Sequence, residues 1–181
     1  VPARDPAKET PLFFKDADQL IKPETAYVMT TLLQAVVDED GGTGGKARSL
    51  GRPSAGKTGS SNMYYDAWFV GFTPNIATGV WVGFDQEKTL GKGEVGGRAA
   101  LPIWLEYMKF AHEGTPVKSF SAPDNIVFAS IDNKTGKLAS ASSKEVVRQA
   151  FIQGTEPSQL QDEMGTDKDQ QQEFYKEDLT E

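Results

Sequence analysis

The stretch Gly51–Ser61, GRPSAGKTGSS, decides which fold this sequence adopts. It begins with G-x-x-x-x-G-K-T, the pattern of a phosphate-binding P-loop. That loop follows a buried strand and opens directly into a helix, because the helix N-terminus and the loop amides bind the phosphates together. Here the preceding letters, GGTGGKARSL, are rich in glycine and basic residues, and the following letters, GSSNMYYDAWFVGFTP, alternate and carry aromatic residues. The flanks therefore favour a strand over a nucleotide-binding loop.

As a strand, the same residues place useful chemistry at the edge of a sheet. Lys57 puts a cation on one face, Thr58 puts a hydroxyl on the other face or the edge, and Gly59 lets another backbone approach. An edge strand also offers unpaired N–H and C=O groups along which an extended peptide can add. Together these groups suit a peptide that ends in a carboxylate. The triplet K-T-G is weak evidence by itself, because Lys134–Gly136 repeats it in a polar turn.

The surrounding sequence predicts helices and antiparallel strands in separate runs, which is the order of an α+β fold. An apolar stripe at three- and four-residue spacing predicts the first helix, and two apolar strands joined by a short Thr-Pro-Asn turn predict a hairpin. The predicted elements are a helix over Pro23–Asp40, a flexible connector over Thr43–Arg52, strands over Ala55–Ser61, Tyr65–Thr73 and Ala77–Asp85, a helix over Arg98–Glu113 that Pro102 limits or bends, and a hairpin over Asn125–Ser140.

Burial of the side chains can also be predicted. Both long strands are apolar on two faces, so we expect helices to cover the sheet from both sides. We expect Trp68 and the other strand aromatics to lie in the core. His112 is the only histidine and stands at a helix end beside Glu113, so we expect it to cap the helix or face solvent.

Composition excludes several classes of function. The chain has 181 residues and 38% hydrophobic content, enough for one domain with a core. It has no cysteine, which excludes disulfides, thiolate metal sites and cysteine nucleophiles. The net charge of −7 falls entirely on the segment from Thr155 onward, so the rest is neutral and offers no basic surface for nucleic acid. No apolar run approaches the roughly 18 residues of a membrane span.

Longer blocks are more specific than the triplet. They read GRPSAGKTGSSNMYYDAWFVGFTPNIATGVWVGFD and GGRAALPIWLEYM, with PETAYVMTTLLQAVV upstream and FIQGTEP downstream. Over about residues 20–157 the chain closely resembles the transpeptidase domain of class A penicillin-binding proteins, the bifunctional enzymes that polymerise and cross-link peptidoglycan. The resemblance implies a partial penicillin-binding/serine β-lactamase-like α+β fold, with antiparallel strands covered by helices, that lacks the N-terminal half bearing the nucleophile.

The resemblance also assigns roles to four residues. In that family a serine in S-x-x-K attacks the D-Ala-D-Ala carbonyl, its lysine assists proton transfer, and S-x-N lines the opposite wall. Only the K-T-G motif can be carried onto this chain. Lys57 would attract the substrate carboxylate, Thr58 would hydrogen-bond it, and Gly59 would admit the acyl donor. The amide of Ser60 would form half of an oxyanion hole, and its hydroxyl would be able to join the contacts to the carboxylate. The resemblance implies no cofactor and no metal.

Two short matches to the other motifs are decoys. Ser54–Lys57 reads S-x-x-K and Ser60–Asn62 reads S-x-N, so all three motifs would fall within nine residues. Residues three apart in a strand face opposite sides, whereas the reacting serine and its lysine must share a helix face. We therefore expect no catalytic residue in this chain. The nucleophile serine and its lysine are expected upstream of Val1, and the chain alone is expected to be inactive.

The expected organisation is an irregular lead-in over 1–22, the C-terminal part of a transpeptidase domain over 23–115, a hairpin-containing segment over 116–157 and an acidic, disordered tail over 158–181. By resemblance, the complete domain binds D-Ala-D-Ala stem peptides and β-lactams, and a glycosyltransferase domain lies elsewhere in the parent protein. That protein would be anchored in the cytoplasmic membrane by an absent N-terminal segment, with this domain on the periplasmic side. The alternatives are a non-catalytic structural or interaction module and, less favoured, a P-loop nucleotide-binding protein.

Overall fold

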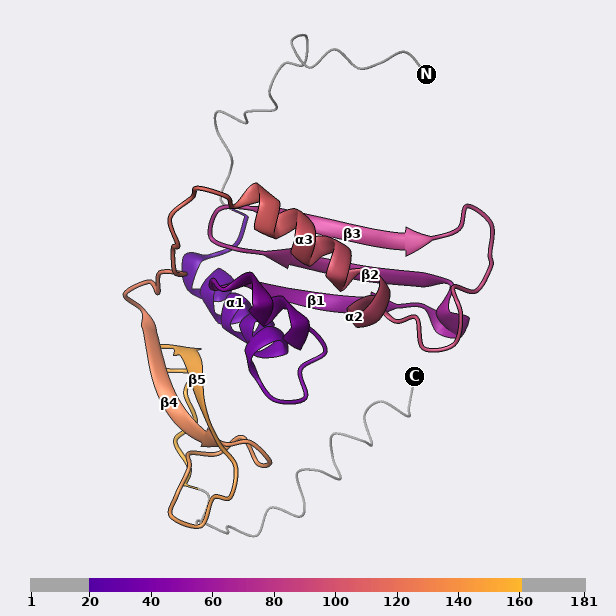
Figure 1. Cartoon of the computed structure of the whole chain (residues 1–181). Coiled ribbons are helices and arrows are strands. Elements are labelled where there is room, and N and C mark those ends of the chain that lie inside the picture. The colour runs from indigo at the N-terminus through magenta and orange to yellow at the C-terminus, as the bar shows by residue number, and fades with distance from the viewer. Residues whose placement is uncertain (1–19, 161–181) are drawn as a thin grey trace.

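A computed structural model of the chain describes residues 20–160. Its main unit is a three-stranded antiparallel sheet in the order β1-β2-β3, built from β1 (Ala55–Ser60), β2 (Asp66–Phe72) and β3 (Ala77–Gly83) (Figure 1). The predicted strands and the tight hairpin between β2 and β3 are therefore confirmed. Thr73 closes that hairpin, because its amide bonds to the carbonyl of Ile76 and its hydroxyl accepts from the amides of Asn75 and Ile76.

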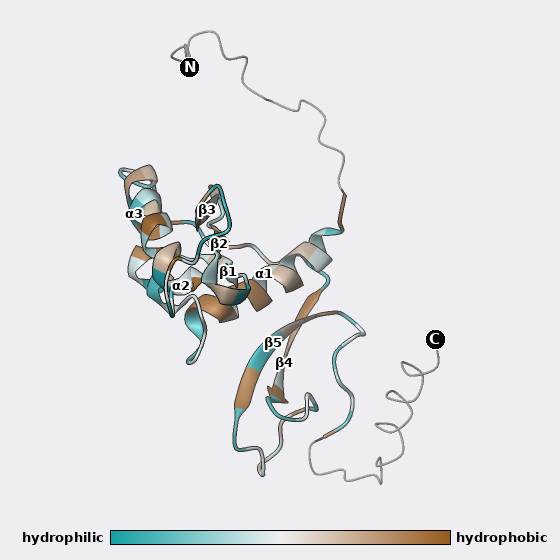
Figure 2. Cartoon of the chain, turned by 90° about the vertical axis from the view of Figure 1, so that its right-hand side faces the viewer, coloured by the Kyte–Doolittle hydropathy of each residue, from teal (hydrophilic) through white to brown (hydrophobic). Residues whose placement is uncertain are grey.

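Two helices cover one face of this sheet. They are α2 (Gly96–Ala99) and α3 (Leu101–Ala111), which lie on the same side of the three strands (Figure 2). Trp104 of α3 packs its ring edge-on against Phe69 of β2, with centroids 5.0 Å apart. The single helix predicted over Arg98–Glu113 is thus two helices, and Pro102 lies in the first turn of the second, where its missing N–H costs no helical bond. The core cluster consists of Val37, Ala47, Phe69, Ala100, Leu101, Trp104 and Met108.

The other face of the sheet is covered only in part. Helix α1 (Pro23–Asp38) packs against β1, where Ala55 is fully buried, whereas β2 and β3 are open on this face within the described part of the chain. The expectation of cover from both sides therefore holds for β1 alone. Burial alternates strictly along β2, and the side chains that point away from α3 remain exposed: Trp68 is 45%, Val70 52% and Trp81 44% exposed. The expectation that Trp68 lies in the core is therefore wrong, although it is right for Phe69. Apolar residues on both faces of a strand show that both faces can be covered, but they do not show which segment of the chain covers each face.

The segment before β1 is more regular than predicted. Helix α1 (Pro23–Asp38) is followed by a 3₁₀ helix, η2 (Gly45–Leu50), where the sequence predicted a flexible connector. The amide of Gly44 returns to the carbonyl of Val36, and a Cβ on Gly42 would overlap that same carbonyl. Glycine at these two positions therefore lets the chain turn back closely against α1. This turn buries Ala47 completely.

A separate two-stranded sheet follows, from β4 (Ile126–Asp132) and β5 (Val146–Ile152) (Figure 1). The hairpin predicted over Asn125–Ser140 has the right first strand and turn but the wrong partner. Asp132 does form a tight turn, because its carboxylate accepts from the amides of Lys134 and Thr135. However, the chain after this turn makes only an isolated bridge to β4 through Leu138. β5, which is richer in β-branched and aromatic residues, pairs with β4 along its whole length instead.

Some predictions fall on residues that the structure does not describe. Most of the lead-in, at 1–19, and most of the acidic tail, at 161–181, lie outside the described residues. Within residues 20–160, no helix has the length and apolar character needed to cross a membrane.

Candidate functional site

The K-T-G triplet lies on β1, which forms the edge of the three-stranded sheet. Among the described residues the main chain of β1 pairs only with β2, with Lys57 opposite Val70 and Gly59 opposite Trp68. Burial falls along the strand from the fully buried Ala55 to the exposed Ser60. The half of β1 that carries the K-T-G triplet is therefore the half that is open to a ligand.

Lys57 lies on the open face of the sheet. Its side chain is exposed on the side of Trp68, Val70 and Trp81, away from helix α3, and its ammonium donates to the carbonyl of Thr58 at 3.0 Å. Because the ammonium is the one cation on this face of β1, it supplies a positive potential next to the free strand edge.

Thr58 and Ser60 point to the opposite side, where neighbouring loops hold them. The hydroxyls of Thr58 and Thr43 are 2.8 Å apart, and the hydroxyl of Ser60 accepts the amide of Gly96 at 3.0 Å. Ser60 thus ties the N-terminus of α2 to the end of β1. Its amide, rather than its hydroxyl, is the group left for a ligand.

Two glycines, Gly59 and Gly96, let main chains pass close to one another at this point. The sequence did not predict that they lie together. A Cβ on Gly59 would come within 3.2 Å of the Cβ of Trp68. A Cβ on Gly96 would overlap the carbonyl of Trp68 and lie 2.7 Å from that of Gly59. The Gly-Gly pair at 96–97 was visible in the sequence, but only the fold reveals that α2 begins directly against the K-T-G strand.

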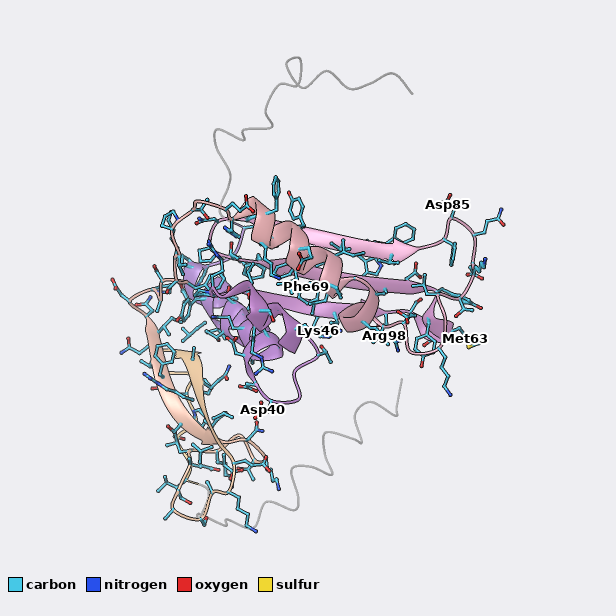
Figure 3. All side chains as sticks on the ribbon, viewed as in Figure 1. Asp40, Lys46, Met63, Phe69, Asp85 and Arg98 are labelled. Atoms are coloured by element: carbon cyan, nitrogen blue, oxygen red, sulfur yellow. The ribbon has the colours of Figure 1, made fainter. Side chains whose placement is uncertain are left out.

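A strained turn follows the strand. Met63 and Tyr64 both have left-handed backbones, with φ of 57° and 58°. Such a conformation costs about 1–3 kcal/mol for a residue other than glycine and is kept only where its surroundings impose it. The loop after β3 imposes it here: the hydroxyl of Thr89 donates to the carbonyl of Met63, and the amide of Leu90 to that of Tyr64, both at 2.8 Å. Figure 3 shows Met63 beyond the C-terminal end of β1.

The structure also contradicts the P-loop alternative. Residues of the G-K-T match form an extended strand, and the next helical segment is the short 3₁₀ turn Asn62–Tyr64, which contains the left-handed Met63. No helix therefore opens from the glycines toward a phosphate. Ser54, the first residue of the decoy S-x-x-K, is only 2% exposed and precedes a strand, so it shares no helix face with Lys57.

His112 lies at the end of α3, in agreement with the capping expectation, but it does not face solvent. It stands at the C-cap of α3, yet its side chain is only 4% exposed. The Arg52 guanidinium donates to its Nδ1 at 2.9 Å, so Nε2 carries the hydrogen and faces the hydroxyl of Thr73 at 3.0 Å. Burial, and then the charge of Arg52, lower the pKa of His112, which favours the neutral ring. This network joins the entry to β1, the β2–β3 turn and the end of α3.

Within residues 20–160 there is no group of three or more metal-ligating side chains. The chemistry of the site therefore consists of one ammonium, two hydroxyls and the free amides and carbonyls of a strand edge. These groups can bind an extended peptide and its carboxylate, but they include no activated nucleophile.

Comparison with known proteins identifies the family. The profile of the penicillin-binding protein transpeptidase domain matches residues 10–109, and that of the penicillin-binding protein 1A C-terminal domain matches residues 122–165. Penicillin-binding protein 1A of Pseudomonas aeruginosa is 47% identical over 124 residues, which is 68% of this chain and 15% of the relative. That of Aquifex aeolicus is 47% identical over 138 residues, 76% of this chain and 18% of the relative.

The fold agrees with these matches. The crystal structure of penicillin-binding protein 1A from Haemophilus influenzae superposes with a TM-score of 0.68 at 35% identity, over 77% of this chain and 22% of that one. The chain thus spans less than a quarter of the length of the relatives it matches, and its α+β architecture is part of a larger fold, as expected. The chain belongs to the penicillin-binding protein transpeptidase family.

Proposed function

We propose that this chain supplies the K-T-G wall of a peptidoglycan D,D-transpeptidase. The parent enzyme would cross-link stem peptides through an acyl-serine intermediate, bind β-lactams and carry a glycosyltransferase domain elsewhere. The observation that carries the proposal is the position of Lys57. Its ammonium lies on the open face of the sheet, beside an edge of β1 that pairs with no strand within residues 20–160. A peptide added to this edge would bring its C-terminal carboxylate to that charge.

Each residue of the motif has a distinct part in the proposal. Lys57 would attract the carboxylate, and the Thr58 hydroxyl would exchange its bond to Thr43 for one to the same carboxylate. The amide of Ser60 would donate to the carbonyl oxygen under attack, where preorganised donors stabilise the developing charge. Gly59, which has no side chain, would let the acyl donor approach the strand closely. These four roles rest on the family motif and on the position of the strand.

The chain by itself would be inactive, because no serine in it precedes a lysine on a shared helix face. We place the nucleophile, its lysine and the second wall upstream of Val1. The same proposal places the domain on the periplasmic side of the cytoplasmic membrane, held there by an N-terminal anchor. Residues 23–115 would form the transpeptidase part and 116–157 the following segment. The profile of the penicillin-binding protein 1A C-terminal domain, which matches residues 122–165, supports treating that second part as separate from the transpeptidase part.

Acylation by fluorescent benzylpenicillin tests the proposal. The natural full-length polypeptide should be labelled covalently, and Lys57→Ala should slow labelling by about 10- to 100-fold, the range for a lost hydrogen bond to a charged group. Lys118→Ala, an exposed lysine far along the chain from the motif, is the matched control and should label at the wild-type rate. The isolated 181-residue chain should take no label. Unchanged acylation in Lys57→Ala, or label on the isolated chain, would contradict the proposal.

A further inference from the structure

We propose that Thr43 is a positioning residue for binding of the donor carboxylate, and that it acts through the hydroxyl of Thr58. This inference rests on the proposed function, in which Thr58 donates a hydrogen bond to that carboxylate. Thr43 belongs to none of the three family motifs and lies in the loop between α1 and η2, 15 residues before Thr58. The fold nevertheless brings the two side-chain hydroxyls to 2.8 Å from each other.

The bond between the two hydroxyls can run in either direction. A threonine hydroxyl has one hydrogen to donate and two lone pairs that accept. While Thr58 donates to Thr43, its only hydrogen is occupied and cannot reach a carboxylate. When Thr43 donates instead, the Thr58 oxygen accepts that hydrogen, and the hydrogen of Thr58 becomes free for the carboxylate. Binding a carboxylate therefore reverses the bond between the two threonines, and the contact itself persists.

The reversed bond helps the ligand in two ways. It fixes the rotation of the Thr58 hydroxyl, so that its hydrogen points away from Thr43, and it polarises that O–H group, because hydrogen bonds in a chain strengthen one another. The Thr43 hydroxyl makes no second hydrogen bond within residues 20–160, so no carbonyl competes for its hydrogen. Thr30 and Thr31 of α1 differ in this respect, since each donates to a carbonyl of its own helix.

The main chain on both sides of Thr43 is tightly packed, which keeps its hydroxyl at Thr58. A Cβ on Gly44 would come within 3.1 Å of the carbonyl oxygen of Val36. A Cβ on Gly97 of α2 would lie 2.8 Å from the carbonyl oxygen of Thr43 and 3.6 Å from Cγ2 of Thr58. The loop is thus enclosed between the end of α1, the start of α2 and the K-T-G strand. Thr43 itself is exposed, so the pair of hydroxyls stays accessible to a ligand.

Acylation of the natural full-length polypeptide by benzylpenicillin, which carries a carboxylate, tests the inference. Thr43→Val keeps the shape of the side chain but removes the hydroxyl. It should lower the second-order rate constant of acylation by about twofold to tenfold, the range for one neutral hydrogen bond. Thr43→Ser keeps the hydroxyl and should retain most of the wild-type rate. The matched control is Thr155→Val, which removes an exposed hydroxyl that donates to the carbonyl of Ile152 and should leave the rate unchanged.

A double-mutant cycle separates an effect through Thr58 from a general effect on the loop. Thr58→Val removes the hydroxyl that Thr43 would orient. In that background Thr43→Val should have no further effect, because the two substitutions interrupt the same chain of hydrogen bonds. A purely structural role of Thr43 would instead lower the acylation rate by the same factor in both backgrounds.

The outcomes distinguish this inference from the proposed function. A wild-type rate in Thr43→Val, a Thr43→Ser variant as slow as Thr43→Val, or equal losses with and without the Thr58 hydroxyl overturns the inference. Each of these results leaves the proposed function standing, because the wild type is still acylated. If benzylpenicillin does not acylate the wild-type polypeptide, the proposed function fails and this inference fails with it.

Discussion

Replacing Gly96 by alanine tests how tightly α2 is set against the K-T-G strand. The new Cβ would overlap the carbonyl oxygen of Trp68 and lie 2.7 Å and 3.1 Å from the carbonyl oxygen and amide nitrogen of Gly59. All three are main-chain atoms of two paired strands, so no change of rotamer relieves the overlap. The start of α2 must therefore move away from the sheet.

The magnitude follows from three terms. Overpacking of this kind costs about 1–3 kcal/mol, and the displaced amide also loses its 3.0 Å bond to the Ser60 hydroxyl, worth about 1 kcal/mol. Alanine returns up to about 1 kcal/mol, because it favours a helix over glycine. We expect Gly96→Ala to lower the free energy of unfolding by about 2 kcal/mol, or the Tm by roughly 4–8 °C for a chain of this size.

Urea unfolding of the 181-residue chain, followed by tryptophan fluorescence, measures this loss. Gly79→Ala on β3 is the matched control, because the nearest atom to its new Cβ is a methyl group of Val70 at an ordinary 3.7 Å. That variant should be as stable as the wild type or slightly more stable. If Gly96→Ala and Gly79→Ala differ by less than about 0.5 kcal/mol, the close approach of α2 does not constrain the strand and the reasoning fails.

Two further substitutions address the core and the buried histidine. Trp104→Ala removes a fully buried ring that packs on Phe69, and it should lower the free energy of unfolding in urea by about 3–5 kcal/mol. Trp81→Ala on the open face should lower it by about 1 kcal/mol. Equal losses of stability in the two variants would refute the assignment of the two faces. Burial and Arg52 lower the pKa of His112, so the unfolded chain binds the proton more tightly and stability should fall as the pH drops below about 6.5. Unfolding at pH 7.5 and 5.0 checks this, and a His112→Gln variant with an undiminished pH dependence would refute it.

The sequence alone determined the family of the chain and the kind of most of its elements, although it missed the 3₁₀ helix η2 and the strand β5. Alternation, turn residues and helix periodicity are local, so they predicted strands over most of 55–85 and a helix from Pro23 to within two residues of its observed end at Asp38. The same local logic placed Lys57 on a strand rather than in a P-loop, because the residues on both sides do not form the flanks that a phosphate loop needs. The roles of Lys57, Thr58, Gly59 and Ser60 in substrate binding remain predictions.

Only the tertiary structure decided which distant segments meet. The partner of β4 is Val146–Ile152 rather than the segment next to it, and His112 is buried against Arg52, 60 residues away in sequence. The left-handed turn at Met63 is held by Thr89, and α2 begins against Gly59. Each of these depends on a contact between residues far apart in the chain. Such contacts form where packing compensates the entropy of loop closure, and no local window of sequence contains both partners.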